Sequence, residues 1–181
     1  MIRIQPISKD TATEKQQAIL TTVQKAMGGV PNLISTMAQS PAVVTAYLGF
    51  SQALSQGSLP AKLRESISLA VGEANSCQYC VSAHSMLGGK AGLSSTDITQ
   101  ARCATAEDPR TAAALAFAKK VVTERGIVAD ADVADLRAQG FDDGEIAEIV
   151  ANVALNIFTN YFNHIAGTEI DFPLAPALKA A

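Results

Sequence analysis

The chain has 181 residues, of which 48% are hydrophobic and 17% charged, a balance typical of a compact globular protein and not of a disordered one. A net charge of -3, without a Lys/Arg cluster interleaved with aromatic residues, argues against nucleic acid as a partner. The N-terminal residues have no apolar signal core, and no uncharged stretch reaches the roughly 18 apolar residues of a membrane span. We therefore expect a cytoplasmic protein with no membrane partner.

Helix caps and helix-ending glycines recur along the whole chain. Ser40 before Pro41 is typical of a helix start, and so is Asp142 with Glu145 three residues on, whereas Gly28 is typical of a helix end. From such signals we expect helices to begin near residues 10, 32, 41, 60, 77, 94, 109, 130 and 142. The last of these is predicted to be the longest.

Strand patterns are nearly absent from the sequence. No run alternates strictly between apolar and polar residues, so strands are not expected beyond two or three residues near Ile2. No fixed-period repeat or low-complexity linker divides the chain. The prediction is an all-α, single-domain helical bundle over residues 1–181. Several helices are rich in alanine and weakly amphipathic, which suggests that some faces are buried against another subunit.

Two cysteines and a histidine stand close together in the predicted helix that begins near residue 77. On a helix, Cys77, Cys80 and His84 fall at i, i+3 and i+7 and share one face, so the imidazole can reach the sulfur of Cys80. Ser76 is a good N-cap, which would place Cys77 in the first turn, where free backbone N–H groups favour a thiolate. A CxxC pair opening a helix lowers a cysteine pKa and can close a short disulfide.

Three cysteines in a chain of this length do not make a disulfide framework, and in a reducing compartment a lone CxxC is more often catalytic or metal-binding. A structural zinc site needs four ligands. Here there is one cysteine pair, the distant Cys103 and only two histidines, so redox chemistry is favoured over zinc. Cys103 has no partner nearby in the sequence and is interpreted as structural.

The stretch LPAKLRESISLAVGEANSCQYCVSAH resembles the core motif of the alkylhydroperoxidase D-like proteins in the carboxymuconolactone decarboxylase family, in their uncharacterised peroxidase-related branch. Four residues of this stretch follow the order and spacing of the family motif. Eleven residues separate Glu65 from Cys77, two separate Cys77 from Cys80, and three separate Cys80 from His84. GGVPNLISTMAQSP resembles the family's entry segment, and NVALNIFTNYFNHIAGTEIDFP its closing helix. The resemblance covers roughly residues 28–173 and implies a homo-oligomer, commonly a trimer or a hexamer.

The resemblance also implies an antioxidant chemistry, the reduction of hydroperoxides. In that chemistry Glu65 draws a proton from His84 through water, His84 helps to hold Cys80 as the attacking thiolate, and Cys77 resolves the sulfenic acid. Helix electrostatics alone would favour Cys77 as the more acidic thiol; we follow the family and expect Cys77 to be the exposed sulfur that meets the donor. The only redox group expected is the Cys77–Cys80 disulfide, reduced by an external dithiol protein, because no flavin or nicotinamide fingerprint is present.

Other polar residues compete for a place in the site. Glu73 is nearer to the cysteines in sequence than Glu65, but it is interpreted as a solvated carboxylate at a helix end. Tyr79 stands where some related proteins have a proton-relaying histidine, so here a water or its hydroxyl would complete the relay. The last helix carries His164 and a polar stripe that either binds backbone across a contact or lines the cysteine pocket. The stripe consists of Asn156, Asn160 and Asn163.

Three other functions remain open at this point. A lactone decarboxylase or hydrolase is possible within the family, although members of that branch, as the resemblance implies, work without a cysteine pair. A general disulfide oxidoreductase, or a non-enzymatic redox sensor, would use the same two cysteines without consuming peroxide. A zinc-stabilised helical scaffold is the third.

Overall fold

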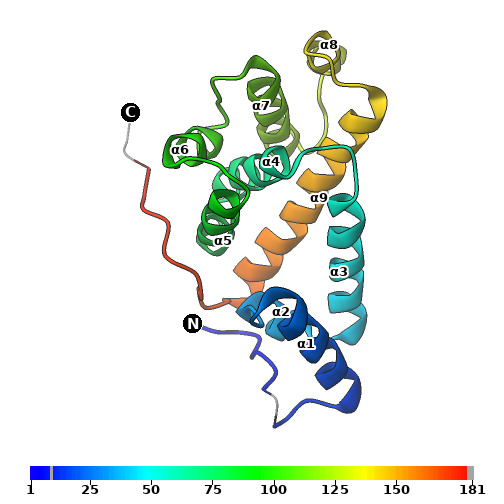
Figure 1. Ribbon diagram of the computed structural model, residues 1–181, viewed down its shortest axis with the longest axis vertical. Coiled ribbons are helices and arrows are strands. Elements are labelled where there is room, and N and C mark those ends of the chain that lie inside the picture. The colour runs from blue at the N-terminus through cyan, green and yellow to red at the C-terminus, as the bar shows by residue number, and fades with distance from the viewer. Residues whose placement is uncertain (9, 179–181) are drawn as a thin grey trace.

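The computed structural model describes residues 1–8 and 10–178, and within these ranges it contains nine helices and no strand (Figure 1). The all-α prediction is therefore confirmed. The helices are α1 (Glu14–Met27), α2 (Asn32–Met37), α3 (Pro41–Ser55), α4 (Ala61–Ala74), α5 (Gln78–Lys90), α6 (Ser95–Arg102), α7 (Pro109–Thr123), α8 (Asp130–Ala138) and α9 (Asp143–Ala166).

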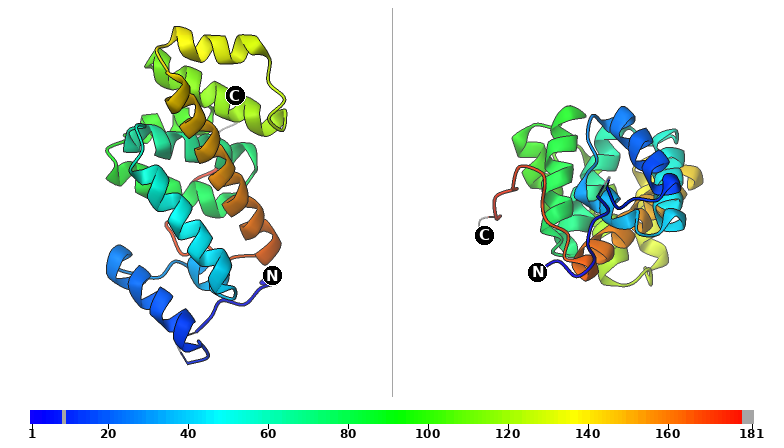
Figure 2. Two further views of the ribbon diagram at one scale, coloured as in Figure 1. Left: turned by 90° about the vertical axis from the view of Figure 1, so that its right-hand side faces the viewer. Right: turned by 90° about the horizontal axis from the view of Figure 1, so that it is seen from below.

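Helix α9 is the longest and runs diagonally through the molecule. It packs against α3, α4 and α7, and its C-terminal half also meets α2 and α5 (Figures 1 and 2). One apolar cluster lies among α4, α7 and α9, around Ile67, Leu115 and Ile149. A second cluster lies among α1, α2 and α3 and includes both Cys77 and Cys80. The two cysteines are thus part of a core that several helices enclose.

Several predicted helix starts are confirmed, and the two with Asp10 and Ser76 as expected caps are displaced. Ser40, Asp108 and Asp142 each accept a hydrogen bond at a helix N-terminus, as their position before Pro or an acidic residue predicts. The first helix begins after Thr13 and not Asp10, because Thr13 and Gln16 form a capping box.

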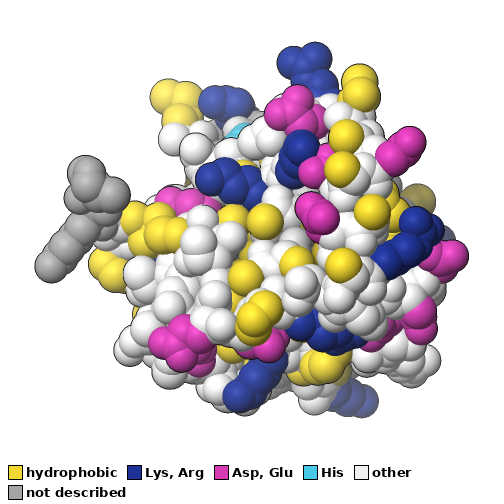
Figure 3. Space-filling model, turned by 90° about the horizontal axis from the view of Figure 1, so that it is seen from above, with side chains coloured by type: hydrophobic (Ala, Val, Ile, Leu, Met, Phe, Trp, Pro, Cys, Tyr) yellow, Lys and Arg dark blue, Asp and Glu magenta, His cyan; other side chains and the backbone are white. Residues whose placement is uncertain are grey.

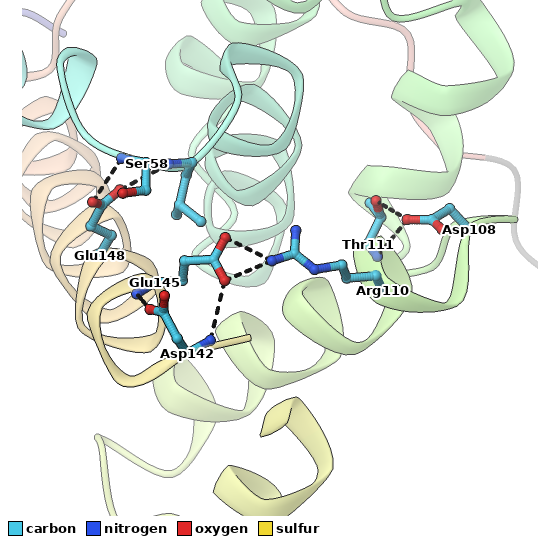
Figure 4. Close-up of polar contacts among 8 residues, drawn as sticks. Ser58, Asp108, Arg110, Thr111, Asp142, Glu145 and Glu148 are labelled. Atoms are coloured by element: carbon cyan, nitrogen blue, oxygen red, sulfur yellow. Dashed lines mark hydrogen bonds and ion pairs between the residues drawn. The ribbon is translucent and has the colours of Figure 1, made fainter. Parts of the chain in front are cut away.

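A partly exposed carboxylate joins α9 to the loop before α4 (Figure 4). Glu148 accepts hydrogen bonds from the backbone N–H groups of Ser58, at 2.8 Å, and Leu59, at 3.0 Å. One turn earlier, Glu145 binds the Arg110 guanidinium at 2.7 Å through both oxygens. These contacts fix the N-terminal half of α9, and thereby the register of its C-terminal half at the cysteines.

We expect Glu148→Gln to lower the free energy of unfolding by about 1–2 kcal/mol at neutral pH, because a charged acceptor of two backbone N–H groups is replaced by a neutral one. The two N–H groups, first that of Ser58, lower the pKa of Glu148. The contribution of its charge is therefore present above the ordinary glutamate pKa and is lost as the pH falls through the lowered one. Chemical denaturation of wild type and variant should show a difference that shrinks in acid, whereas the exposed control Glu107→Gln should show none at either pH.

The surface is mixed in charge. On the face seen in Figure 3, acidic and basic side chains are interspersed among apolar ones. Among the described residues, no helix is both long enough and apolar enough to cross a membrane.

Candidate active site

The link between α4 and α5 places the cysteines. Ser76 has a left-handed backbone, with φ of 54°, and its N–H donates to Glu73 O while the N–H of Cys77 donates to Gly72 O. This pair of bonds is the Schellman ending of α4. Ser76 therefore ends one helix and does not cap the next, contrary to our expectation, because an N-cap requires an extended backbone.

As a consequence, Cys77 itself is the N-cap residue of α5 and Cys80 lies in the first turn. The N–H of Cys80, in this first turn, acts on Cys77 in the direction of a lower pKa, whereas side chains, first that of Cys77, lower the pKa of Cys80. Gly72 allows this close packing, because a Cβ there would lie 3.3 Å from Val81 Cγ2 and 3.6 Å from Cys80 Cβ. A side chain at this position would press on Val81 and force it, or the two helices, to shift slightly.

The two sulfur atoms are in contact and buried. Cys77 Sγ donates to Cys80 Sγ over 3.0 Å, and the residues are 1% and 2% exposed. The expectation that Cys77 would be the exposed sulfur is wrong, since the C-terminal segment and α2 cover this end of α5. The hydrogen bond from Cys77, together with the charge of His84 and the amide of Asn163, lowers the pKa of Cys80 even though burial raises it. The same Cys80 contact and burial raise the pKa of Cys77.

Glu65 and His84 meet across the antiparallel pair α4 and α5. Glu65 Oε2 lies 2.8 Å from His84 Nδ1, and the side chains are 23% and 22% exposed. The contact is direct, so the water that we expected between them is not needed. Burial lowers the pKa of His84, but the hydrogen bond and charge of Glu65 outweigh it and raise the pKa above its ordinary value. The imidazole makes no hydrogen bond to a cysteine among the described residues.

The competing carboxylate lies elsewhere. Glu73 Oε2 pairs with Arg102 Nε at 2.8 Å, and Arg102 also donates to Pro176 O. It is thus an ion-paired group that fastens α6 and the C-terminal segment, and not the free solvated carboxylate of our interpretation. Cys103 is exposed at the C-cap of α6, where it packs in no core, so its structural interpretation finds no support.

Tyr79 does not point its hydroxyl to the cysteines. The oxygen accepts the N–H of Leu33 at 3.1 Å, and the ring packs edge-on against Phe172, with centroids 5.5 Å apart. Burial raises the pKa of Tyr79, so the hydroxyl stays neutral. The Tyr79 hydroxyl thus joins α5 to α2. Water is then the remaining candidate for the proton-relay step expected of Tyr79 or a water.

The polar stripe of α9 binds side chains, and not backbone, of the neighbouring helices, and one of its members, Asn156, lines the cavity beside Cys80. Asn163 Nδ2 donates to Cys80 Sγ at 3.3 Å, and Thr159 Oγ1 lies 4.0 Å from the same sulfur. Asn156 Nδ2 instead donates to Ser68 Oγ of α4, and Asn160 Oδ1 accepts from Asn75. His164 is exposed and takes no part.

A cavity of about 660 Å³ opens onto these groups. Cys80, Glu65 and His84 line it, but Cys77 does not. Sequence reasoning missed Tyr47, which also lines it; burial first, and then the charges of Cys80 and Glu65, raise its pKa to about 12. Its position on an apolar stripe gave no sign of this role. Much of the remaining wall is apolar, with Leu33, Ile34, Leu54, Met86, Leu87 and Phe172.

The arrangement suits thiol redox chemistry on a small, partly apolar molecule. It offers an acidic thiol facing a cavity, a second thiol in contact behind it, and a carboxylate–imidazole pair beside it. No group of three or more His, Cys, Asp or Glu side chains within residues 1–8 and 10–178 is placed to hold a metal ion.

Comparison with known proteins gives a family match over part of the chain and a fold over nearly all of it. Residues 41–120 match the carboxymuconolactone decarboxylase family. The fold matches a solved alkylhydroperoxidase core protein, an uncharacterized peroxidase-related protein from Ralstonia eutropha JMP134, with a TM-score of 0.85 and 28% identity over 94% of this chain and 92% of that one. No curated protein matches significantly in sequence.

Two further solved structures share the fold at lower identity. The debrominase Bmp8, in complex with 2,3,4-tribromopyrrole, has a TM-score of 0.80 and 21% identity over 94% of this chain and 92% of that one. An uncharacterized peroxidase-related protein from Silicibacter sp. TM1040 has a TM-score of 0.79 and 22% identity over 92% of each chain. The likeness confirms the fold that the CxxC motif predicts.

Proposed function

We propose that this chain, whose residues 41–120 match the carboxymuconolactone decarboxylase family and whose fold matches an alkylhydroperoxidase core protein, is a thiol-dependent peroxidase for organic hydroperoxides. One observation carries the proposal. Cys80, with its lowered pKa, faces a largely apolar cavity and has a second thiol 3.0 Å away. An acidic thiol reached only through such a cavity suits a peroxide with an organic group.

The reaction runs in two chemical steps. The Cys80 thiolate attacks one peroxide oxygen, so that an S–O bond forms, the O–O bond breaks, and the alkoxide leaves as an alcohol with a proton from His84. The thiolate of Cys77 then attacks the Cys80 sulfur; a disulfide forms, the S–O bond breaks, and water leaves with a proton. An external dithiol returns the disulfide to two thiols and is itself oxidised.

The division of roles between the cysteines follows from their surroundings. Cys80 accepts hydrogen bonds from Cys77 and Asn163, and these favour its thiolate. Cys77, as the donor in the first of them, is held as a thiol. The nucleophile is therefore Cys80, and Cys77 is the resolving residue. Because Cys80 and not Cys77 lines the cavity, a dithiol donor has to reach the disulfide at Cys80 through the cavity mouth.

Burial of both sulfur atoms constrains disulfide exchange in the peroxidase and in the alternative of a general disulfide oxidoreductase alike. Exchange requires a sulfur that the partner thiol can approach along the S–S axis. At 1% and 2% exposure, Cys77 and Cys80 offer none on the outer surface, so either function needs a donor whose thiol reaches Cys80 through the cavity.

We propose further that the protein is a homo-oligomer. Phe158, Tyr161 and Ile165 lie at i, i+3 and i+7 on the outer face of α9 and are 40%, 52% and 62% exposed. A stripe of large apolar side chains on one helix is the kind of surface that a second subunit covers.

The test is a stopped-flow titration of the reduced protein with cumene hydroperoxide and with hydrogen peroxide, counting free thiols. We expect rapid loss of the Cys77 and Cys80 thiols and retention of the exposed Cys103, with cumene hydroperoxide the faster oxidant because of the apolar wall. Tribromopyrrole serves as a third reactant, since the debrominase shares the fold. Thiols that react no faster with either peroxide than free cysteine does would contradict the proposal.

A further inference from the structure

We propose that Asn163 is a further catalytic residue: its Nδ2 group stabilises the Cys80 thiolate, and its Oδ1 atom then accepts a hydrogen bond from the O–H of the sulfenic acid that forms on that sulfur. The second half of this inference rests on the proposed peroxidase function, whereas the first half concerns the reduced protein alone.

The contact with the thiolate is direct and enclosed. Asn163 Nδ2 lies 3.3 Å from Cys80 Sγ, and the asparagine is 4% exposed. Cys77 and Thr159 also contact this sulfur, and Asn160 contributes to its lowered pKa. A hydrogen bond to a charged acceptor is roughly twice as strong as one between neutral groups, and it is stronger still away from water. Asn163 thus adds to the acidity of Cys80.

The other end of the same amide has no partner. Asn163 Oδ1 is a buried acceptor to which no side chain or backbone group of the described residues donates. A buried carbonyl left without a donor costs free energy, so its retention in a core needs a reason. Asn156 lies two turns earlier on the same face of α9. It shows the ordinary structural use of such an amide, since it joins α9 to α4 through a hydrogen bond to Ser68.

Oxidation of Cys80 creates the missing donor. When the thiolate takes one peroxide oxygen, Sγ–O⁻ or Sγ–OH stands where only a sulfur lone pair stood, and Sγ–OH is an O–H donor. The orphaned Oδ1 belongs to the side chain whose Nδ2 already touches this sulfur. Holding the O–H there keeps the sulfenic acid neutral and keeps its sulfur turned to Cys77. It also slows attack on a second peroxide, which would give a sulfinic acid.

The experiment uses full-length Cys77→Ser/Cys103→Ser protein, in which Cys80 is the single thiol. Asn163→Leu removes both ends of the amide, whereas Asn163→Asp keeps an acceptor and removes the donor. Gln16→Leu is the matched control, because Gln16 is a buried amide (7% exposed) that donates to Ala38 O and does not line the cavity. Thermal melts identify any variant that has not folded. If only one Asn163 variant folds, its alkylation midpoint alone tests the thiolate half of the inference.

The thiolate half is read from the pH dependence of alkylation by iodoacetamide, which requires no peroxide. We expect the midpoint of Cys80 alkylation to rise by about one pH unit in Asn163→Leu, a roughly tenfold slower reaction below the midpoint, and by at least as much in Asn163→Asp. The midpoint of Gln16→Leu should match the parent. Unchanged midpoints in both Asn163 variants would overturn the inference, even if the peroxidase activity stands.

The sulfenic acid half is read by adding cumene hydroperoxide, trapping the sulfenic acid with dimedone, and measuring sulfinic acid by mass spectrometry. We expect several-fold more sulfinic acid in Asn163→Leu than in the parent, and a value near the parent in Asn163→Asp, which retains the acceptor. Equal values in all three proteins would overturn this half alone. A parent that forms no sulfenic acid would refute the peroxidase proposal and this half together, while the alkylation midpoints would still decide the thiolate half.

Discussion

Cys80→Ser is expected to abolish hydroperoxide reduction, because the hydroxyl that replaces the thiol is not ionised at neutral pH and cannot attack the peroxide. Cys77→Ser should behave differently. It retains the nucleophile but not the resolving thiol, so it should consume one equivalent of peroxide and stop at the sulfenic acid. The two variants together separate the first chemical step from the second. The measurement is peroxide consumed per chain, first without and then with an excess of a dithiol reductant.

Cys103→Ser is the control for this pair. Cys103 lies exposed at the end of α6, outside the cavity, and its replacement should leave both the rate and the stoichiometry unchanged. The assignment of the nucleophile would be reversed if Cys77→Ser were inert and Cys80→Ser gave the single turnover. It would be wrong altogether if both variants retained full turnover, because neither cysteine would then be needed to reduce the peroxide.

Loss of the imidazole should have the second largest effect. We expect His84→Gln to lower the second-order rate constant for cumene hydroperoxide by about 10²–10³-fold, the usual contribution of a general acid that protonates a leaving group. Cys80 should remain able to react with iodoacetamide, since the amide of Asn163 and the thiol of Cys77 still contact its sulfur. Equal losses towards peroxide and iodoacetamide would mean that His84 acts only through the thiolate.

Glu65→Gln should reproduce part of this loss and shift the pH profile. Glu65 raises the pKa of His84, so His84 holds its proton to a higher pH in wild type than in the variant. The fall in rate on the alkaline side should therefore move to lower pH in Glu65→Gln. Glu73→Gln removes a carboxylate from the same helix that pairs with Arg102, and its profile should stay that of wild type. If the pH profile of Glu65→Gln did not move, the proposed effect of Glu65 on the pKa of His84 would be contradicted.

Local signals explain how much of the fold could be predicted. A helix start depends on one residue and the backbone that follows it, so Ser40 before Pro41 and the Asp142–Glu145 box predicted α3 and α9 correctly. Asp10 failed because Thr13 forms a stronger, reciprocal cap nearby. Ser76 failed because its backbone already serves as the left-handed end of α4, which its side chain does not reveal.

The site was predictable where the chemistry lies within one or two adjacent helices. The spacing of the CxxC pair and His84, and of Glu65 on α4, indicated a group that the fold does assemble. Cys80, His84 and Glu65 line one cavity, and Cys77 contacts Cys80 outside its lining. The exposure of Cys77 was not predictable, because the segments that bury it come from α2 and from the chain after α9. Asn163 was named only as one member of a stripe, since its contact with Cys80 spans 83 residues.

The segments that enclose the cysteines have a consequence for synthesis of the protein. Asn163 follows Cys80 by 83 residues, and Ala175, whose N–H binds Ser82 on the same helix, follows Ser82 by 93. On the ribosome the two thiols therefore emerge long before the elements that shield them. Until α9 and the C-terminal segment have been translated, both thiols of a nascent chain are exposed, and oxidants can reach them without passing through the cavity that Cys80 lines in the finished protein.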